Sequence, residues 1–572
     1  MQPGRGEAVI GAERQQRRAC KGSRKYKNKF QVEFDEQKIN SIFAELDQSQ
    51  KAGATVGLAI RGQPVYRRGF GLASMDLPVL LTPTVRMRIA STSKHFACFA
   101  YLLLCEDGLL TIDDTIGMHL PELSPIIHGV TMRQVMGNIS GLWDAGDLTA
   151  QFSGPIHRQI TAGDLLDVYR DVDAVAFPPG ERFSYNNGAW HILGAVIEKV
   201  TGKPLEEVLK VRVFDPVGMG DTLLRRWDRQ FIPNCASAHI VSEAGGYERG
   251  EYIGGIDYGA AGAIVTTVDD MLRWMAHMST PRVGNAETWR SMMTPQTLLN
   301  GTSSGYSLGL TFSQYRGVDT IFHGGGSFGA TAQMVKVPGA QFDVIVMVNR
   351  GDADADSLAR KILDACLPNL EPPRIAPDTP PVTGIFRSRC TGRVLHLFKY
   401  EKAPTESAGV YADGTWLCSL DGHYVPVEWN DTGSIQSRSD ISIFKLTMSA
   451  VGDAAAPSAI LLSDFGNVDE LSALTVNAGA SAGSLLGRYR STATRTEATI
   501  AWTDEGLTLT TVGRFGDARH KLTPLTDGVW QTAALKRLTR PPWGLVTLDR
   551  DGGGFTFSTT LTRNVHFQLV VK

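Results

Sequence analysis

The stretch Arg88-Ile-Ala-Ser-Thr-Ser-Lys-His-Phe96 decides how this chain is interpreted, because it places Ser91 three residues before Lys94. The apolar run that follows predicts a helix over 92–107, closed by Gly108. Residues three apart on a helix share a face, so the two side chains can meet. Ser91 would also stand at the helix N-terminus, where unpaired N–H groups favour developing negative charge. If burial keeps Lys94 neutral, the pair predicts a nucleophile and its base.

Taken alone, a serine three residues before a lysine is a weak signal. Ser442-Ile-Phe-Lys445 is a second copy, in a run that alternates like a strand. Residues three apart on a strand point to opposite faces, so no serine–lysine pair is expected there. At Ser91 the competing interpretation is an ordinary N-cap serine followed by a solvated lysine. Further motifs must decide between the two interpretations.

Two further motifs follow Ser91 along the chain. The first is Tyr185-x-Asn187, and the second is His323-x-Gly325 at the edge of a predicted strand. The order Ser-x-x-Lys, Tyr-x-Asn, His-x-Gly resembles that of the penicillin-recognising serine hydrolases. This class C β-lactamase-like family includes D,D-peptidases, D-aminopeptidases and family VIII esterases.

The resemblance continues between the motifs and spans roughly residues 31–367. The segments that carry it are Ala100–Asp114, Thr131–Leu142, Phe214–Met219 and Gly262–Met271. It implies an α/β fold, with a β-lactamase/transpeptidase-like catalytic domain made of an antiparallel sheet, helices and an inserted helical region. The residue pattern agrees, because strand-like runs stand at both ends of this region and helical periodicity between them. The clearest runs are strands at 55–61, 64–72, 331–337 and 341–349 and helices at 162–170, 188–201, 204–212 and 353–366.

The resemblance implies a role for each motif residue. Ser91 would be the acylated nucleophile, and Lys94 would take its proton. Tyr185 would relay a proton to the leaving group, and Asn187 would orient Lys94 and a substrate amide. The N–H groups of Ser91 and Gly326 would form the oxyanion hole, worth roughly 3 kcal/mol of barrier per donor. Whether Lys94 or Tyr185 is the acylation base stays open.

His323 departs from the pattern of the β-lactamases, which usually carry Lys-Thr-Gly where this chain has His323-Gly-Gly325. A lysine there is a fixed cation for a substrate carboxylate, whereas a histidine near neutral pH is charged only part of the time. The D-aminopeptidases and esterases of the family share His-x-Gly. The resemblance therefore implies an ester or amide substrate rather than a β-lactam, with His323 as a further catalytic residue.

A rival nucleophile is Ser327, because Gly325-Gly-Ser-Phe-Gly329 matches the G-x-S-x-G elbow of α/β-hydrolases. That elbow needs a helix after the serine, whereas 330–337 reads as a strand, so a glycine-rich turn is expected. His95 lies four residues after Ser91 and could share its helix face. A packed or surface histidine is the preferred interpretation there.

Metal signatures are weak. The sequence has no HExxH motif. Asp352, Asp354 and Asp356 alternate like the start of a calcium loop, but Ser357 and Leu363 replace its required glycine and glutamate. A polar turn that begins a helix is expected there, with no metal and no cofactor.

The C-terminal part changes character. Six prolines crowd the segment 367–381, which predicts a linker, and short alternating runs follow it. Gly384-Ile-Phe-Arg-Ser388 and Gly487-Arg-Tyr-Arg-Ser491 form a faint repeat, as expected of two similar β-domains. The predicted organisation is a basic disordered tail (1–30), the catalytic domain (31–367), a Pro-rich linker (368–381) and two small antiparallel β-barrel domains (382–480 and 481–572).

Two C-terminal β-domains resemble the D-aminopeptidase branch in particular, in which a loop from a C-terminal β-domain narrows the active site. We expect the corresponding loop at 513–521, which carries Arg519 and His520; a solvated hairpin is the alternative. With Gly325, these residues are the candidates for substrate binding. A basic loop would suit a peptide with carboxylates, such as linearised microcystin with its D-residues. The expected function is therefore a serine peptidase or amidase, with a family VIII-type carboxylesterase or a non-catalytic penicillin-binding-like protein as alternatives.

Composition sets the remaining expectations. The chain has 572 residues, 42% of them hydrophobic and 20% charged, with a net charge of −2. This balance favours neither nucleic acid nor a membrane as a partner. The partner that the resemblance implies is a small peptide, amide or ester substrate. Seven cysteines without a CxxC pair argue against a disulfide framework. The basic tail is either a native segment or an over-long start of the gene. It lacks the apolar core of a secretory signal, so a cytoplasmic protein is expected. The oligomeric state stays open, a homodimer included.

Overall fold

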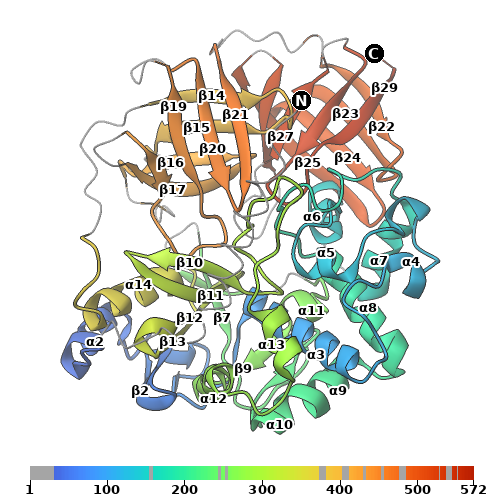
Figure 1. Ribbon diagram of the computed structural model, residues 1–572. Coiled ribbons are helices and arrows are strands. Elements are labelled where there is room, and N and C mark those ends of the chain that lie inside the picture. The colour runs from blue at the N-terminus through green and yellow to red at the C-terminus, as the bar shows by residue number, and fades with distance from the viewer. Residues whose placement is uncertain are drawn as a thin grey trace, which may run out of the picture.

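The computed structural model describes residues 31–571 except 154–158, 243–245, 251–254, 373–381, 402–410, 412, 430–432, 453–456, 476–482, 484, 527, 536–543 and 550–551. The described chain forms a sheet-and-helix region (31–372), with two β-barrels side by side above it in Figure 1. The predicted tail (1–30) and most of the predicted linker (368–381) lie outside the described residues.

Six antiparallel strands form the main sheet, in the order β10-β11-β12-β13-β1-β2. Their bounds are Ala54–Ile60 (β1), Gln63–Phe70 (β2), Thr311–Tyr315 (β10), Val318–Ser327 (β11), Ala330–Val337 (β12) and Phe342–Val348 (β13). β1 pairs with β13, so the two ends of the sheet-and-helix region meet in the centre of the sheet. Every residue of β13 is buried, and all except Asp343 are apolar, as expected when helices cover both faces. The four predicted strands are thus confirmed.

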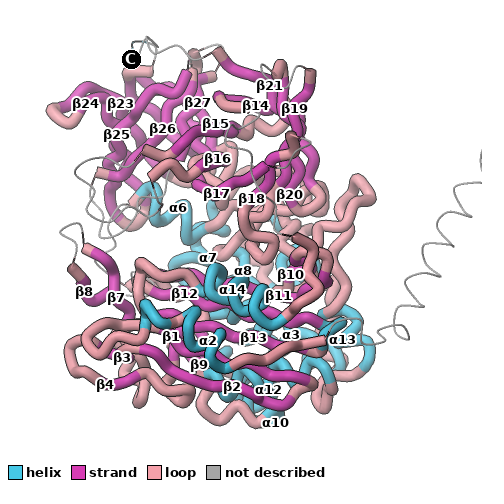
Figure 2. The backbone as a smooth tube through the Cα atoms, turned by 90° about the vertical axis from the view of Figure 1, so that its left-hand side faces the viewer, coloured by secondary structure: helices cyan, strands magenta, loops and turns pink. Residues whose placement is uncertain are grey.

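Helices cover both faces of this sheet. α12 packs on β1 and β13, and α14 packs on β12 and β13 from the opposite side, beside α2 (Figure 2). Alternation along β13 explains this, because Val344 and Val346 join the core under α2 and α14, whereas Ile345 and Met347 join the core under α12. The helices are α2 (Glu36–Ile42), α3 (Lys94–Glu106), α4 (Ile116–His119), α5 (Met132–Met136), α6 (Ala145–Phe152), α7 (Ala162–Asp171), α8 (Ala189–Thr201), α9 (Leu205–Leu209), α10 (Asp215–Val217), α11 (Gly259–Gly262), α12 (Val268–Ser279), α13 (Ala286–Met292) and α14 (Ala355–Cys366).

Most helices of this region lie between β2 and β10 in the sequence, which confirms the predicted inserted helical region. The predicted helix over 204–212 is split, because α9 gives way to a π-helical turn at Lys210–Phe214. Short strands complete the region: β3 (Leu72–Ser74), β4 (Val79–Leu80), β5 (Met87–Arg88), β6 (Leu223–Leu224), β7 (Ala238–Val241), β8 (Tyr247–Gly250) and β9 (Ile264–Thr266).

Each C-terminal β-domain is a closed antiparallel barrel of consecutive strands, β14–β21 and β22–β29. The first contains β14 (Gly384–Ser388), β15 (Val394–Lys399), β16 (Trp416–Leu420), β17 (His423–Trp429), β18 (Ile435–Ser437), β19 (Thr447–Val451), β20 (Ala459–Asp464) and β21 (Asn467–Leu474). The second contains β22 (Gly487–Ser491), β23 (Thr496–Thr503), β24 (Gly506–Gly513), β25 (Gly516–Thr526), β26 (Val529–Ala534), β27 (Gly544–Leu548), β28 (Gly554–Ser558) and β29 (Val565–Val571).

The faint repeat has a structural counterpart, because its two copies are the first strands of the two barrels. Each copy opens on a glycine with a positive φ, 129° at Gly384 and 154° at Gly487. Only glycine adopts these angles readily, so the repeat preserves the same backbone turn into each barrel.

Two further expectations concern the whole chain. All cysteines that the structure describes are free thiols, in line with the expected lack of a disulfide framework. None of the described helices is long and apolar enough to cross a membrane.

Candidate active site

The segment with Ser91 is a 3-10 turn, Ala90–Ser93, that leads directly into α3. Ala90 has a φ of +45°, a left-handed conformation that is strained for a residue with a Cβ. β11 packs against this turn so closely that a Cβ on Gly325 would lie 2.0 Å from the carbonyl oxygen of Ile89. Such strain persists only where surrounding contacts enforce it, and it presents the Ser91 side chain at a partly exposed position.

Lys94 is fully buried and meets Ser91 as predicted, with its Nζ 3.2 Å from the serine Oγ. The same nitrogen lies 2.7 Å from Oδ1 of Asn187 and 2.9 Å from the carbonyl oxygen of Ala261. Both of these oxygens only accept hydrogen bonds, so they take the two N–H groups of a neutral amine. In the ammonium form the third N–H donates to the Ser91 hydroxyl oxygen, whereas in the neutral amine a lone pair takes that place and can accept the hydrogen of the hydroxyl.

Burial lowers the pKa of Lys94 from its usual value to about 7, although the charge of Asp144 partly opposes this. The lysine therefore exists in the neutral form in a large share of molecules at neutral pH. The competing interpretation, a solvated lysine after an N-cap serine, does not describe this site.

Asp144 lies beside the candidate site, and the motifs did not reveal it. Its carboxylate caps α6 by accepting from the N–H groups of Gly146 and Asp147, and it also accepts from the N–H of Asn187 at 2.6 Å. Burial raises its pKa to about 6. Asp144 thus fixes the backbone of the Tyr185-x-Asn187 motif and places a negative charge near Lys94. An Asp just before a short helix is an N-cap signal that would have found it.

Tyr185 lies beside Lys94, whose Nζ is 4.8 Å from the centre of the tyrosine ring. The hydroxyl is buried, and among the described residues it makes no geometrically satisfactory hydrogen bond. Burial raises the pKa of Tyr185 above its usual value, and the neighbouring Ser91 hydroxyl opposes that rise. The tyrosine is therefore protonated at neutral pH and holds a proton close to Ser91.

His323 is fully buried rather than open to the cleft. Its Nδ1 lies 2.6 Å from the carbonyl oxygen of Gly324, so this nitrogen carries the hydrogen, and its Nε2 accepts from the Tyr306 hydroxyl at 3.1 Å. Burial and the charge of Lys94 lower the pKa of His323 to about 3. The expectation of a partly charged histidine is therefore wrong, because His323 is neutral across the physiological range. Its main-chain oxygen accepts from Thr92 and ties β11 to the nucleophile turn.

The rest of the His-x-Gly strand borders the site. A Cβ on Gly326 would meet nothing within 4 Å, so this residue has open space beside its main chain. Ser327 ends β11 and is followed by β12, and its hydroxyl donates to the carbonyl oxygen of Ala330. A nucleophile elbow would require a helix after the serine, so it is excluded. The expected glycine-rich turn is confined to Phe328 and Gly329, because Gly325 and Gly326 lie in β11 and pair with β12.

The family model described as Beta-lactamase matches residues 39–367. The chain belongs to the beta-lactamase family. This confirms the predicted fold and the predicted enzyme class, a serine hydrolase.

Individual relatives agree with this assignment. The chain is 28% identical over 374 residues to a D-aminopeptidase of Brucella anthropi, in an alignment that covers 64% of this chain and 69% of the relative. It is 29% identical over 354 residues to a D-aminopeptidase of Brucella ovis, with 60% and 65% covered. Among solved structures, the octameric penicillin-binding protein homologue from Pyrococcus abyssi has a TM-score of 0.55 at 21% identity, covering 77% of this chain and 100% of the other. A penicillin-binding protein from Bacillus halodurans has a TM-score of 0.50 at 22% identity, with 58% and 98% covered.

In this beta-lactamase-family chain, the structure places the predicted substrate loop 513–521 elsewhere. Arg519 pairs with Glu505 at 2.7 Å, and buried His520 shares a hydrogen bond of 2.8 Å with the carbonyl oxygen of Gln151. Arg514 at the hairpin turn pairs with two aspartates of α7. The prediction that this loop enters the cleft is therefore wrong, because Arg514 and His520 hold the hairpin on α7 and α6, and Arg519 pairs with Glu505 of the same barrel. The alternative of a solvated hairpin holds in part, because the segment is a β-hairpin with Gly516, Asp517 and Lys521 exposed but His520 buried.

Two other barrel segments lie against Tyr185. The first is the loop 438–446 between β18 and β19, whose Phe444 ring is 6.2 Å from the Tyr185 ring. This loop contains Ser442 and Lys445, which form a turn rather than the expected strand, and Lys445 donates to Ser313 instead of meeting Ser442. The second is the loop 559–564 between β28 and β29, whose Leu561 packs on the apolar cluster around Tyr185.

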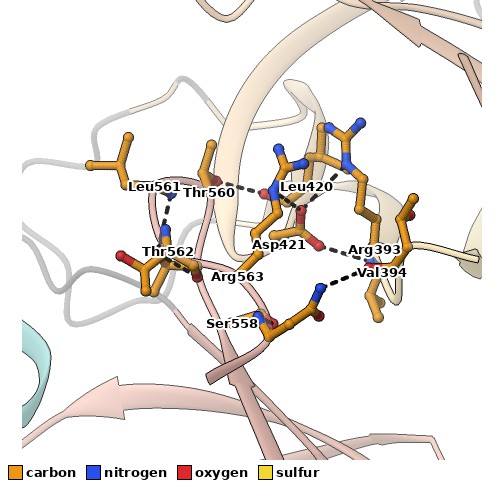
Figure 3. A network of polar contacts seen from close by, with 12 residues as sticks. Arg393, Val394, Leu420, Asp421, Ser558, Thr560, Leu561, Thr562 and Arg563 are labelled. Carbon is orange, nitrogen blue, oxygen red and sulfur yellow. Dashed lines mark hydrogen bonds and ion pairs between the residues drawn. The ribbon is translucent and has the colours of Figure 1, made fainter. Parts of the chain in front are cut away.

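A buried ionic network holds these parts together. Arg393 on the first barrel makes hydrogen bonds of 2.7–3.0 Å to Asp464 and Asp469, and Arg182 of the sheet-and-helix region also donates to Asp469. Figure 3 shows Arg393 and Arg563, from the two barrels, on either side of Asp421. Because the network includes all three parts of the molecule, it fixes both barrel loops relative to Tyr185.

His95 and the alternating aspartates are placed as the sequence predicted. His95 is fully buried and stacks on Trp274 at 5.5 Å. Asp352 pairs with Arg350, and Asp354 caps α14, so the alternating aspartates form a polar turn. Within the described ranges, no group of three or more metal-ligating side chains is placed to hold a metal ion.

Proposed function

We propose that this protein hydrolyses amide or peptide bonds through an acyl-enzyme on Ser91, with Lys94 as the base. The observation that carries the proposal is the position of the Lys94 amine, which is buried and 3.2 Å from the Ser91 hydroxyl. Two acceptor oxygens occupy its N–H groups, so the lone pair is aimed at the proton that must leave. This favours Lys94 over Tyr185 as the acylation base, because the Tyr185 phenol holds its proton at neutral pH.

Acylation then follows from the arrangement. The Ser91 oxygen attacks the carbonyl carbon while its proton moves to Lys94, and a tetrahedral oxyanion forms. The N–H groups of Ser91 and Gly326 receive this oxyanion. Collapse of the intermediate breaks the carbon–nitrogen bond, and Tyr185 passes a proton to the leaving nitrogen. Lys94 then passes its proton to Tyr185, which restores both groups. An amine departs, and an acyl ester on Ser91 remains.

Deacylation repeats these steps with water. Lys94 takes a proton from the attacking water, the tetrahedral intermediate forms again, and the bond between the acyl carbon and Ser91 breaks. The serine oxygen regains a proton, and a carboxylic acid departs. Asn187 positions Lys94 throughout, and Asp144 positions Asn187 through its main-chain N–H.

The substrate class is inferred from the relatives and from His323. The curated relatives are named D-aminopeptidases, which supports amide bonds next to D-residues as the first choice. His323 is neutral and engaged with Tyr306, so it supplies no cation of the kind that Lys-Thr-Gly gives to a β-lactam carboxylate. Small or linear peptides with D-residues are the proposed substrates.

The test begins with a fluorophosphonate probe and mass spectrometry. The expected result is an adduct on Ser91 that is lost in Ser91→Ala and in Lys94→Ala but kept in Ser327→Ala. An adduct on Ser327, or an unmodified protein, would refute the proposed nucleophile. A panel of D- and L-aminoacyl anilides, linear peptides, p-nitrophenyl esters and nitrocefin then identifies the bond. Turnover of the esters alone would point to a carboxylesterase instead.

A further inference from the structure

The second barrel grips the C-terminal end of α6, which lies below β24 and β25 in Figure 1. The carbonyl oxygens of a last helical turn have no partner within the helix. In α6 the carbonyl oxygen of Gln151 accepts from Nε2 of His520 in β25 at 2.8 Å. The Phe152 ring lies against the buried rings of Phe557 and Phe567, with centres 5.1 and 5.4 Å away. The barrel therefore supplies both a polar and an apolar support for this end of the helix.

The N-terminal end of α6 is held by another part of the same barrel, the loop between β28 and β29. Nε1 of Trp143 donates to the main-chain oxygen of Arg563 in this loop at 2.6 Å. The hydroxyl of Thr559 in the same loop donates to the carboxylate of Asp147, also at 2.6 Å. Trp143 and Thr559 are both buried. The β28–β29 loop thus holds one residue before Asp144 and one residue after it.

Asp144 transmits this support to the base. It accepts from the N–H of Asn187 at 2.6 Å, and Oδ1 of Asn187 lies 2.7 Å from Nζ of Lys94. The charge of Asp144 also favours the ammonium form of Lys94. Burial and the neighbouring Asp147 raise the pKa of Asp144 itself to about 6. Both the position and the charge of Asp144 therefore depend on residues that the loop holds.

We propose that the β28–β29 loop is a positioning element of the active site, which holds Asp144 in place from both sides and, through it, Asn187 and Lys94. Trp143 and Thr559 are the positioning residues, and they act through Asp144 rather than on the substrate. A displacement of about 1 Å at a reacting group can cost about a hundredfold in rate, so a loop outside the reacting centre can control the reaction. The proposal rests on the proposed function, because the position of Lys94 matters to the rate only if Lys94 is the base.

Trp143→Phe tests the proposal, because it keeps an aromatic ring and removes only the donor to Arg563. The rate of fluorophosphonate labelling at Ser91 should fall about tenfold, and kcat/KM should fall with it, chiefly through kcat. The acid limb of the pH profile should move to lower pH, because Lys94 loses part of the influence of Asp144. A purely structural role would lower the urea midpoint and leave the limb in place.

Trp289→Phe is the matched control. Trp289 is also buried, and its Nε1 donates to the main-chain oxygen of Val283 at 2.9 Å. The control loses the same kind of hydrogen bond at a position that does not contact the β28–β29 loop. Its acid limb should therefore coincide with that of the wild type.

Other titratable groups do not interfere with this measurement. Those that interact with Lys94 or Asp144 include Cys98, Tyr169, Tyr185, His191 and His323. Burial raises the pKa of the thiol and of both phenols and lowers the pKa of both histidines to about 3. None of them changes its charge between about pH 5 and about pH 9. A shift of the acid limb therefore reports on Asp144 and Lys94.

The loop also offers a second pair of variants, which decides the question if Trp143→Phe does not fold. Thr559→Val should move the acid limb in the same direction as Trp143→Phe. Thr559→Ser keeps the hydroxyl and should restore the wild-type limb. Thr560→Val is the control within the loop, because the Thr560 hydroxyl donates to the carbonyl oxygen of Leu420 in the first barrel instead, as Figure 3 shows. It should leave the limb unchanged.

A double variant tests whether the effect passes through Asp144. In the Asp144→Asn background, Trp143→Phe should reduce kcat/KM by less than about twofold further, because the group it positions is already altered. Reductions that simply multiply would overturn the inference, as would a limb that neither Trp143→Phe nor Thr559→Val moves while the wild type is labelled at Ser91. In those cases the proposed function stands. A wild-type protein without an adduct on Ser91 would instead refute the proposed function, and this inference with it.

Discussion

Lys94 should set the pH dependence of acylation. Burial lowers its pKa from 10.5 to about 7, which corresponds to a penalty of about 5 kcal/mol for the ammonium form. Acylation should be faster at higher pH, because only the neutral amine of Lys94 can take the proton of Ser91. kcat/KM should therefore rise with pH through about 7. Well below that pH it should fall about tenfold per pH unit, and well above it should reach a plateau.

Asp144→Asn should move this acid limb in a defined direction. The carboxylate of Asp144 favours the ammonium form of Lys94, so its removal lowers the pKa of Lys94 and shifts the limb to lower pH. The new amide still accepts from Gly146 at the start of α6 but loses the acceptor for the N–H of Asn187. The plateau should therefore fall as well. Because the pKa of Asp144 is itself raised to about 6, the wild-type profile contains two coupled steps and the variant only one.

The assay is the rate of fluorophosphonate labelling at Ser91 together with kcat/KM, each followed from about pH 5 to about pH 9. Asp113→Asn is the matched control, since Asp113 is an exposed carboxylate paired with Arg133 and should leave the limb in place. A flat wild-type profile would show that Lys94 is not the base. A limb that Asp144→Asn moves to higher pH would refute the electrostatic argument.

Three other substitutions test the site and its support. Tyr185→Phe should slow acylation of amide substrates about a hundredfold or more, and wild-type rates would refute the proton relay. Its thermal stability should be nearly unchanged, because the Tyr185 hydroxyl makes no hydrogen bond among the described residues. Gly325→Ala should lower the free energy of unfolding by about 2 kcal/mol or more, since its Cβ would lie 2.0 Å from the Ile89 oxygen. The control Gly326→Ala should be as stable as the wild type, and equal urea midpoints for the two variants would contradict the argument. Arg393→Met should lower the free energy of unfolding by about 3–5 kcal/mol, because it leaves buried carboxylates unpaired. A variant as stable as the wild type would show that this ionic network does not hold the barrels in place.

The spacing of residues close together in the sequence was enough to predict the Ser91–Lys94 pair. The helix that carries Lys94 is strongly apolar, and its spacing from Ser91 fixes the geometry before any tertiary contact is known. The strands and helices of the sheet-and-helix region were also predictable, because burial on both faces of β13 leaves a continuous apolar run. Asn187 was found through its motif, and its hydrogen bond to Lys94 agrees with the implied role.

Long-range docking could not be predicted in the same way. Asp144 is recognisable only as a helix cap, and its second role depends on the Asn187 N–H, which lies far along the chain. The basic hairpin 513–521 was chosen by charge, but charge alone does not reveal which surface a hairpin meets, and its groups are used by α6 and α7. The loop 438–446 was discounted because it alternates like a strand, yet it lies in a turn against Tyr185.

The neutral state of His323 and the low pKa of Lys94 belong to one electrostatic argument. A permanent cation at position 323 would lie close to Lys94, and since Lys94 and His323 already influence each other, it would lower the pKa of Lys94 further. A neutral His323, bonded to Tyr306 and Gly324, avoids this and leaves the base near pH 7. The cost is that β11 then offers no cation to a substrate carboxylate.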